Sequence, residues 1–147
     1  MKKFYLFAMI LSSFLCADTS VDKLFKDVKT PLPCDLNKEI CASMKSGEKI
    51  DFQITPTPIL AMKESVLSVS GFERELSNPT IQITGISMFM GNFKANLTRL
   101  DERTYSAKIM VAPCVSPIMR YKIEVFDNGV STGHFVYFDL HKSANFR

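Results

Sequence analysis

Apolar and polar residues alternate with a period of two through much of the chain after Gly47. The stretches YSAKIMV at Tyr105–Val111 and RYKIEVF at Arg120–Phe126 show it most clearly, because every second residue from Tyr105 and from Tyr121 is apolar. Successive side chains of a β-strand point to opposite faces. The alternation therefore predicts strands with one buried face and one face in water.

Seven such runs are separated by turn residues, which is the spacing of a sandwich. Asp127-Asn128-Gly129 is a strong hairpin signal, since Asn and Gly adopt positive φ at little cost, and it predicts antiparallel pairing of the last two runs. We predict an all-β fold, an antiparallel two-layer β-sandwich that is immunoglobulin-like in general architecture. The predicted strands are Lys49–Thr55, Val66–Ser70, Ile81–Met90, Lys94–Leu100, Tyr105–Val111, Arg120–Phe126 and His134–Leu140.

The pattern before Gly47 is different. Apolar residues at helical spacing within Asp18–Lys29 predict one short amphipathic helix, and Pro31 and Pro33 end it and lead into a cysteine-bounded loop. We predict a signal peptide at residues 1–17, the helix and loop at residues 18–46, and the β-sandwich domain at residues 47–147. The apolar residues of the helix are Val21, Leu24, Phe25 and Val28.

The first residues have the pattern of a secretory signal. Two lysines precede the apolar stretch Phe4–Leu15, which is shorter than the roughly 20 residues that span a bilayer. Small residues favour cleavage after Ala17. The alternative, a lipoprotein signal acylated on Cys16, requires a small residue where Leu15 stands. We predict a periplasmic protein with no transmembrane segment in the mature chain.

The charge balance excludes one class of partner. The whole chain has 18 basic and 15 acidic residues, and removal of Lys2 and Lys3 leaves 16 against 15, a net charge of +1. No block of Lys or Arg is dense enough to follow a phosphate backbone, so we expect no nucleic-acid binding.

Three cysteines remain after removal of the signal: Cys34, Cys41 and Cys114. An odd number in an oxidising compartment indicates one disulfide and one remaining thiol. We predict the Cys34–Cys41 pair, because a short loop closes with little loss of chain entropy, and the bridge is worth about 2.5 kcal/mol. The alternative joins Cys114 to one of the other two.

Sulfur is concentrated in two short stretches, SMFMGNF at Ser87–Phe93 and APCVSPIMRY at Ala112–Tyr121. On a regular strand Met88 and Met90 would share a face, with Cβ atoms about 6.6 Å apart. Cys114 and Met119 stand on either side of a turn-like linker. One thiolate and up to three thioethers would form a site for a soft ion such as Cu(I), which is our predicted cofactor.

Packing is the competing explanation of these sulfurs, because methionine fills irregular cores and buried cysteine behaves as a small hydrophobe. Placement favours ligation: Gly91 follows the methionine pair and prolines flank Cys114, so both groups lie at strand ends. We expect His134 and His141 to be solvated. We expect no enzyme, since Cys114 and His134 lack a recognisable orienting third group.

The order of these features resembles a pattern in small, uncharacterised secreted bacterial proteins. The pattern has two cysteines separated by six residues, then Pro-x-Pro, Met-x-Met-Gly, a proline and cysteine turn, and Met-x-Trp. This chain has Tyr121 in place of the Trp, and Pro117 where the pattern has Gly. More distantly, the chain is similar to YtkA/FixH-like extracytoplasmic domains, a resemblance that implies copper handling or oxidase assembly. The matching residues are Cys34, Cys41, Pro56, Pro58, Met88, Met90, Gly91, Pro113, Cys114 and Met119.

Two functions follow as hypotheses. The first is a periplasmic Cu(I)-binding or copper-delivery protein that uses Met88, Met90, Cys114 and Met119 and passes the ion to a copper acceptor. The second is an envelope accessory module that binds another protein through an edge strand, with its sulfurs as core packing.

Overall fold

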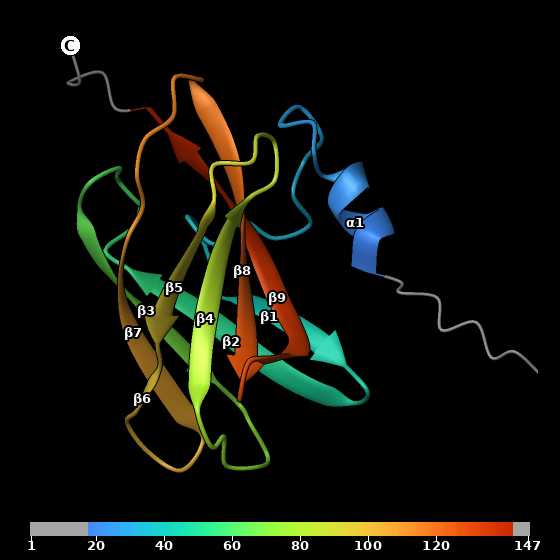
Figure 1. Cartoon of the computed structure of the whole chain (residues 1–147), viewed down its shortest axis with the longest axis vertical. Helices are drawn as coiled ribbons and strands as arrows, with labels where there is room; N and C mark the ends of the chain where they lie inside the picture. The colour runs from blue at the N-terminus through green and yellow to red at the C-terminus, as the bar shows by residue number, and fades with distance from the viewer. Residues whose placement is uncertain (1–17, 143–147) are drawn as a thin grey trace, which may run out of the picture.

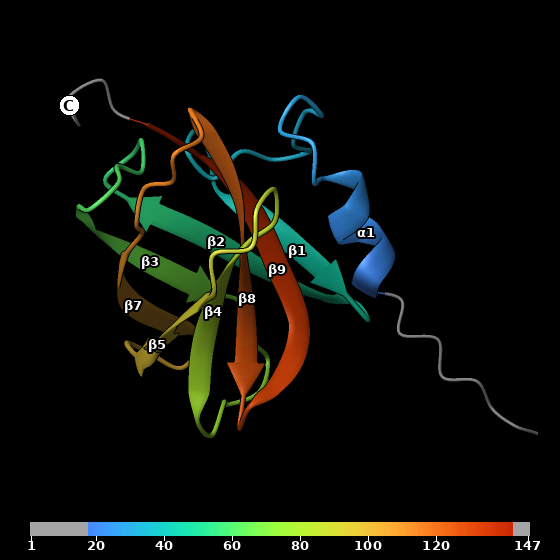
Figure 2. The same cartoon turned by 45° about the horizontal axis from the view of Figure 1, so that its top comes forward.

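The computed structural model describes residues 18–142, and the signal peptide predicted at residues 1–17 lies outside them. Two antiparallel sheets pack against each other (Figures 1 and 2), which confirms the predicted all-β sandwich. No helix among residues 18–142 has the length and apolar character needed to cross a membrane. The elements are α1 (Asp18–Leu24), β1 (Cys41–Lys45), β2 (Glu48–Thr55), β3 (Glu64–Ser70), β4 (Pro79–Gly85), β5 (Asn92–Asn96), β6 (Thr98–Arg99), β7 (Thr104–Met110), β8 (Ile118–Asp127) and β9 (Val130–His141).

One sheet has the order β1-β2-β3-β7-β6, and the other has the order β5-β4-β8-β9. The predicted hairpin is confirmed: β8 and β9 pair antiparallel, and Asn128 and Gly129 between them have φ of 51° and 77°. The alternating apolar residues fill the space between the sheets. Tyr121 of β8 stacks on Phe138 of β9 with ring centroids 5.4 Å apart, and both are almost completely buried.

Two predicted strands have different bounds. The run Ile81–Met90 is wrong as a single strand, because β4 ends at Gly85 and the chain then folds back. The run Lys94–Leu100 is also wrong as a single strand. Buried Leu97 divides it, and the Leu97 N–H donates to the Pro79 carbonyl at 2.9 Å, so β5 belongs to one sheet and β6 to the other.

The sequence pattern missed β1, which lies in the segment predicted as a loop. Its inward positions are Cys41 and Ser43, so it has no apolar alternation to detect. The Ser43 hydroxyl accepts a hydrogen bond from the Phe135 N–H of β9 at 3.2 Å. The predicted disulfide between Cys34 and Cys41 is confirmed and ties the preceding loop to the start of β1, as expected in an oxidising compartment.

The outer face of β8 is not in water as predicted. The N-terminal segment (residues 21–30) covers it, and Arg120 is only 1% exposed. The Arg120 guanidinium pairs with both oxygens of Asp139 at 2.8 Å and donates to the carbonyls of Phe25, Asp27 and Val28 at 3.1–3.2 Å. A buried charge requires such partners.

Two further contacts hold the N-terminal segment. The Tyr137 hydroxyl donates to Asp22 at 2.7 Å, and the ring of Phe25 packs on the ring of Tyr137 with centroids 5.1 Å apart. A helix was predicted within Asp18–Lys29, but α1 is shorter and ends at Leu24. Leu24 remains 64% exposed, so the segment is held mainly by polar contacts with β8 and β9 rather than by an apolar helix face.

Asp127, the last residue of β8, holds the segment before β4 by hydrogen bonds. One carboxylate oxygen accepts from the N–H groups of Ser77 and Asn78 at 2.9 Å, and the other pairs with Arg74 at 2.9 Å. The hydrogen bond from the Asn78 N–H, assisted by Arg74, holds the pKa of Asp127 below its ordinary value of 3.8. The ionised form is therefore favoured in the folded state.

We predict that this carboxylate contributes to acid unfolding. A folded pKa below the unfolded one contributes stability that is present above pH 3.8 and is lost as the pH falls further. Asp127→Asn should lower the free energy of unfolding at neutral pH by about 2 kcal/mol, because the hydrogen bonds lose a charged acceptor. The difference between the two proteins should shrink in urea titrations at successively lower pH. A constant difference would contradict the assignment.

Candidate metal centre

Two loops at one end of the sandwich carry the sulfur-rich stretches. The loop of residues 86–91 joins β4 to β5, and the loop of residues 111–117 joins β7 to β8. Backbone contacts with β8 fix the first loop: the Ile86 N–H donates to the Arg120 carbonyl at 2.8 Å, and the Arg120 N–H donates to the Ser87 hydroxyl at 3.2 Å. Gly91, with φ of 81°, then directs the chain into β5.

The second loop is held at both ends. The carbonyl of Val111 accepts from the Met62 N–H at 2.9 Å, and the carbonyl of Pro117 accepts from the Lys142 N–H at 2.9 Å. Between these points the Ser116 hydroxyl donates to the Ile118 carbonyl at 2.8 Å. Both loops are therefore held by hydrogen bonds to neighbouring segments of the chain.

The structure brings two of the four predicted ligands together. The Cys114 thiol contacts the thioether of Met88 with a sulfur–sulfur distance of 3.9 Å. Cys114 is a free cysteine, as predicted, and it is partly exposed. Met88 is 49% exposed. The pair therefore lies where an ion can reach it from solvent.

Met119 lies under the first loop. It is 1% exposed, and a Cβ added at Gly85 would come within 2.5 Å of its terminal methyl group and 2.4 Å of the Met88 carbonyl oxygen. The tip of Met119 and the backbone of Met88 therefore lie on the same side of Gly85. This methionine belongs to the core and reaches the underside of the candidate site.

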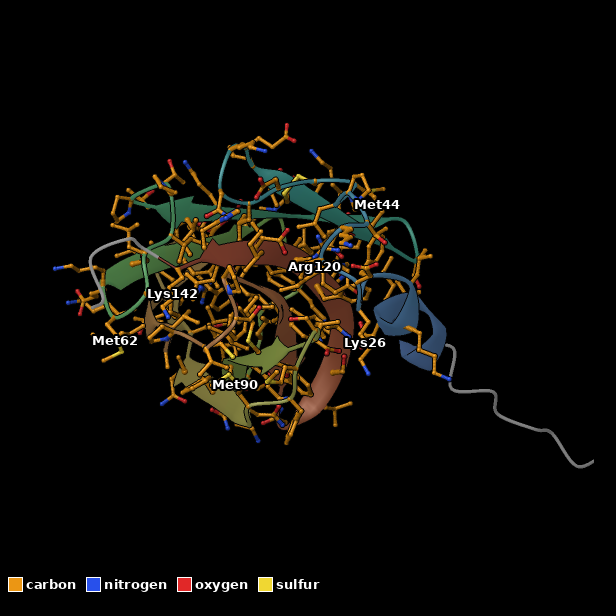
Figure 3. The ribbon with its side chains drawn as sticks, turned by 90° about the horizontal axis from the view of Figure 1, so that it is seen from above. Lys26, Met44, Met62, Met90, Arg120 and Lys142 are labelled. Carbon is orange, nitrogen blue, oxygen red and sulfur yellow. A yellow bond between two sulfur atoms is a disulfide. The ribbon has the colours of Figure 1, made fainter. Side chains whose placement is uncertain are left out.

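Met90 is placed differently from the prediction. The regular strand that would put Met88 and Met90 on one face does not exist, because β4 ends before both residues. Met90 lies in the same loop as Met88 and is 38% exposed (Figure 3). Cys114 and Met88 thus form the centre of the candidate site, with Met119 beneath it and Met90 nearby in sequence.

Tyr121 forms an electrostatic neighbour of the thiol. Burial raises the pKa of Tyr121, and the Coulombic effect of Cys114 raises it further, so the neutral phenol is favoured. Its hydroxyl donates to the Ala112 carbonyl at 3.0 Å in the same loop. Sequence reasoning assigned no role to Tyr121 or Gly85, although a glycine that ends an alternating run is a signal of close backbone approach.

The distance between the two sulfurs suits a shared ion. Two metal–sulfur bonds of about 2.3 Å, the length found in zinc thiolate sites, enclose an angle of about 115° when their sulfurs are 3.9 Å apart. Within residues 18–142, no three histidine, cysteine or carboxylate side chains cluster as metal ligands. The candidate donors at this end are therefore soft sulfurs.

Of the two histidines, His134 lies apart from this site, whereas His141 pairs with Ile118 where the second loop enters β8. His134 is buried rather than solvated as predicted, and its Nε2 lies 3.1 Å from the Glu48 carboxylate. Its ring also packs edge-on against Phe72. His141 is exposed, as predicted.

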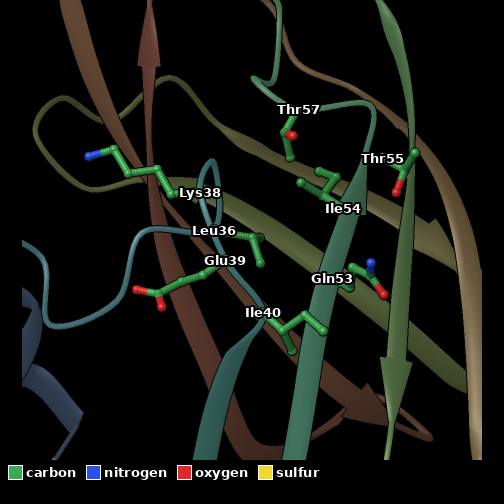
Figure 4. A pocket seen from close by; sticks show the side chains of 8 residues that line it. All are labelled: Leu36, Lys38, Glu39, Ile40, Gln53, Ile54, Thr55 and Thr57. Atoms are coloured by element: carbon green, nitrogen blue, oxygen red, sulfur yellow. The ribbon is translucent and has the colours of Figure 1, made fainter.

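A hollow of about 230 Å³ lies between the loop before β1 and strand β2 (Figure 4). The side chains of Leu36 and Ile40 lie toward β2, and the charged groups of Lys38 and Glu39 point away from it. Gln53, Thr55 and Thr57 add polar side chains to its lining.

Comparison of the chain with family models, with curated proteins and with solved structures finds no match.

Proposed function

We propose that this protein binds a soft metal ion, Cu(I), through Cys114 and Met88 at the end of a periplasmic β-sandwich. The observation that carries the proposal is the 3.9 Å contact between their sulfur atoms. A thiolate and a thioether are ligands that select Cu(I) over hard cations. Met119, whose tip lies beside Gly85 beneath the Met88 loop, and Met90 are the other two sulfurs of the predicted set.

The surroundings support a site that both binds and releases an ion. Met88 is 49% exposed, and Phe89 beside it in the same loop is 74% exposed. The side chains at the tip of the loop can therefore change conformation while Ile86 and Ser87 hold its base to β8. The role that follows is delivery of Cu(I) to an acceptor, because two accessible sulfur ligands can be exchanged one at a time for those of a partner.

Titration with Ag(I) tests the proposal. Ag(I) is a soft ion that needs no added reductant, so the Cys34–Cys41 disulfide remains intact during the measurement. The wild type should bind one ion per chain, and Cys114→Ser and Met88→Leu should each weaken binding at least about tenfold, or 1.4 kcal/mol. Leu nearly conserves the volume of methionine, so the fold should remain intact.

Met44→Leu is the matched control, because Met44 lies on β1, is 65% exposed and is far from Met90 in Figure 3. It should bind Ag(I) as the wild type does. Zn(II) should bind weakly to all four proteins. Equal Ag(I) affinity of the wild type and the Cys114→Ser protein would refute the proposal, because the thiolate is its central ligand.

A further inference from the structure

Along one side of the sandwich, β5 of one sheet lies next to β7 of the other (Figures 1 and 2). Within the described chain, β5 pairs only with β4, and β6 pairs with β7 only at Tyr105 and Ser106. The strand switch at Leu97 is the cause, because it ends β5 and leaves only the two residues of β6 beside β7. The β7 edge beyond Ser106 therefore has no neighbouring strand in the described chain.

Two adjoining hollows form a groove along this side, which we call the β5–β7 groove. The first has a volume of about 120 Å³, and the second, of about 430 Å³, shares Ala95 and Lys108 with it. Buried Ile83 and Ile109 line the first hollow together with Phe93 and Met110. Phe93 is 38% exposed and Met110 is 50% exposed, so the interior of the groove is apolar and open to solvent.

The edges of the groove are basic. Lys94 of β5 and Lys108 of β7 line its mouth. Lys108 is 73% exposed and pairs with Glu64 at 3.0 Å, whereas Lys94 has no carboxylate within 4.0 Å among residues 18–142. The mouth therefore keeps an excess of positive charge over an apolar interior.

We propose that the β5–β7 groove binds an extended segment of another protein in which apolar and acidic residues alternate. Side chains of an extended segment alternate between two directions, so apolar ones enter the groove while acidic ones remain at the mouth near Lys94 and Lys108. The unpaired backbone of β7 beyond Ser106 accepts the segment by strand addition. A second copy of this edge is disfavoured, because it would bring like charges together.

The probe for this proposal is a short, labelled, acetylated peptide of alternating valine and glutamate, measured by fluorescence anisotropy with the full mature chain. It should bind, and a peptide of alternating valine and lysine should bind at least about tenfold more weakly. The affinity should fall as salt is added, because the lysines are exposed. Equal affinity for the two peptides, or no binding of the glutamate peptide, overturns the proposal.

Variants locate the binding site. Lys94→Glu and Lys108→Glu should each weaken binding of the glutamate peptide about tenfold, and Met110→Glu should do the same by placing a charge in the groove. Lys26→Glu is the matched charge reversal on the N-terminal segment, away from the groove (Figure 3), and should leave affinity unchanged. An equal loss in Lys26→Glu would show that only net charge matters and would overturn the proposal.

The proposal stands independently of metal binding. Met88→Leu removes a predicted metal ligand and lies outside the residues that line the groove, so it should leave peptide affinity unchanged. If Met88→Leu lost the peptide as completely as Lys94→Glu does, the binding surface would be the sulfur loops and not the groove.

Discussion

Replacement of Arg120 by methionine is expected to lower the free energy of unfolding by about 3–5 kcal/mol, because it leaves the largely buried Asp139 carboxylate without its partner. The Asp139 side chain, which is only 18% exposed, would lose its ion pair with the guanidinium. The carbonyls of Phe25, Asp27 and Val28 would lose their donor as well. Urea unfolding measures the stability, and hydrogen exchange should show the N-terminal segment opening.

Two further proteins separate the causes. Arg120→Lys keeps the charge but cannot supply the five fixed donors of a guanidinium, so it should recover only part of the loss. The double variant Arg120→Met with Asp139→Leu should be more stable than Arg120→Met alone, because no unpaired buried charge remains. A loss below about 1 kcal/mol in Arg120→Met would show that the ion pair behaves as a surface pair does.

The Arg120 site also shows what the sequence could not predict. The alternation in β8 correctly predicts that Tyr121, Ile123 and Val125 are buried. It also predicts a wet second face, and that prediction is wrong for Arg120 and Lys122, which are buried. The residues that cover them lie about ninety positions earlier, as in the contact of Arg120 with Asp27, and no local pattern encodes so distant a contact.

Predictions that rest on local signals fared better. The Asn128-Gly129 turn and the Cys34–Cys41 disulfide are both confirmed, and each depends on residues close together in sequence. In the candidate site, Met88 and Cys114 lie together as predicted, but the strand that was expected to carry Met88 and Met90 was wrong. The apolar residues of Ile81–Met90 were visible in the sequence, but the end of the strand at Gly85 was not.

The candidate metal centre and the β5–β7 groove are connected by the chain. The loop that carries Met88 leads directly into β5, and the loop that carries Cys114 follows directly from the end of β7. A segment bound along the groove would therefore lie next to the sulfur pair. If both proposals hold, peptide binding should change the rate at which Ag(I) leaves the protein.

Substitution of Gly85 by alanine should disturb the candidate metal centre from beneath, without removing any of its sulfur atoms. The added Cβ would lie 2.4 Å from the Met88 carbonyl oxygen and 2.5 Å from the methyl group of Met119. The methionine tip can move, but the carbonyl belongs to backbone that is tied to β8 by the Ile86 N–H. We expect a loss of about 1–3 kcal/mol in stability, typical of overpacking, together with weaker Ag(I) binding.

Gly91→Ala is the matched control in the same loop. A Cβ at Gly91 meets no atom within 4 Å, and its φ of 81° imposes only the strain of the left-handed region, about 1–2 kcal/mol. Both variants should therefore lower the free energy of unfolding, but only the Cβ added at Gly85 displaces Met88 and Met119. Gly85→Ala should weaken Ag(I) binding by pushing Met88 away from Cys114, whereas Gly91→Ala should leave that contact in place. Equal losses of Ag(I) affinity would mean that general loosening of the loop, and not the packing of Gly85 beneath Met88, determines the affinity.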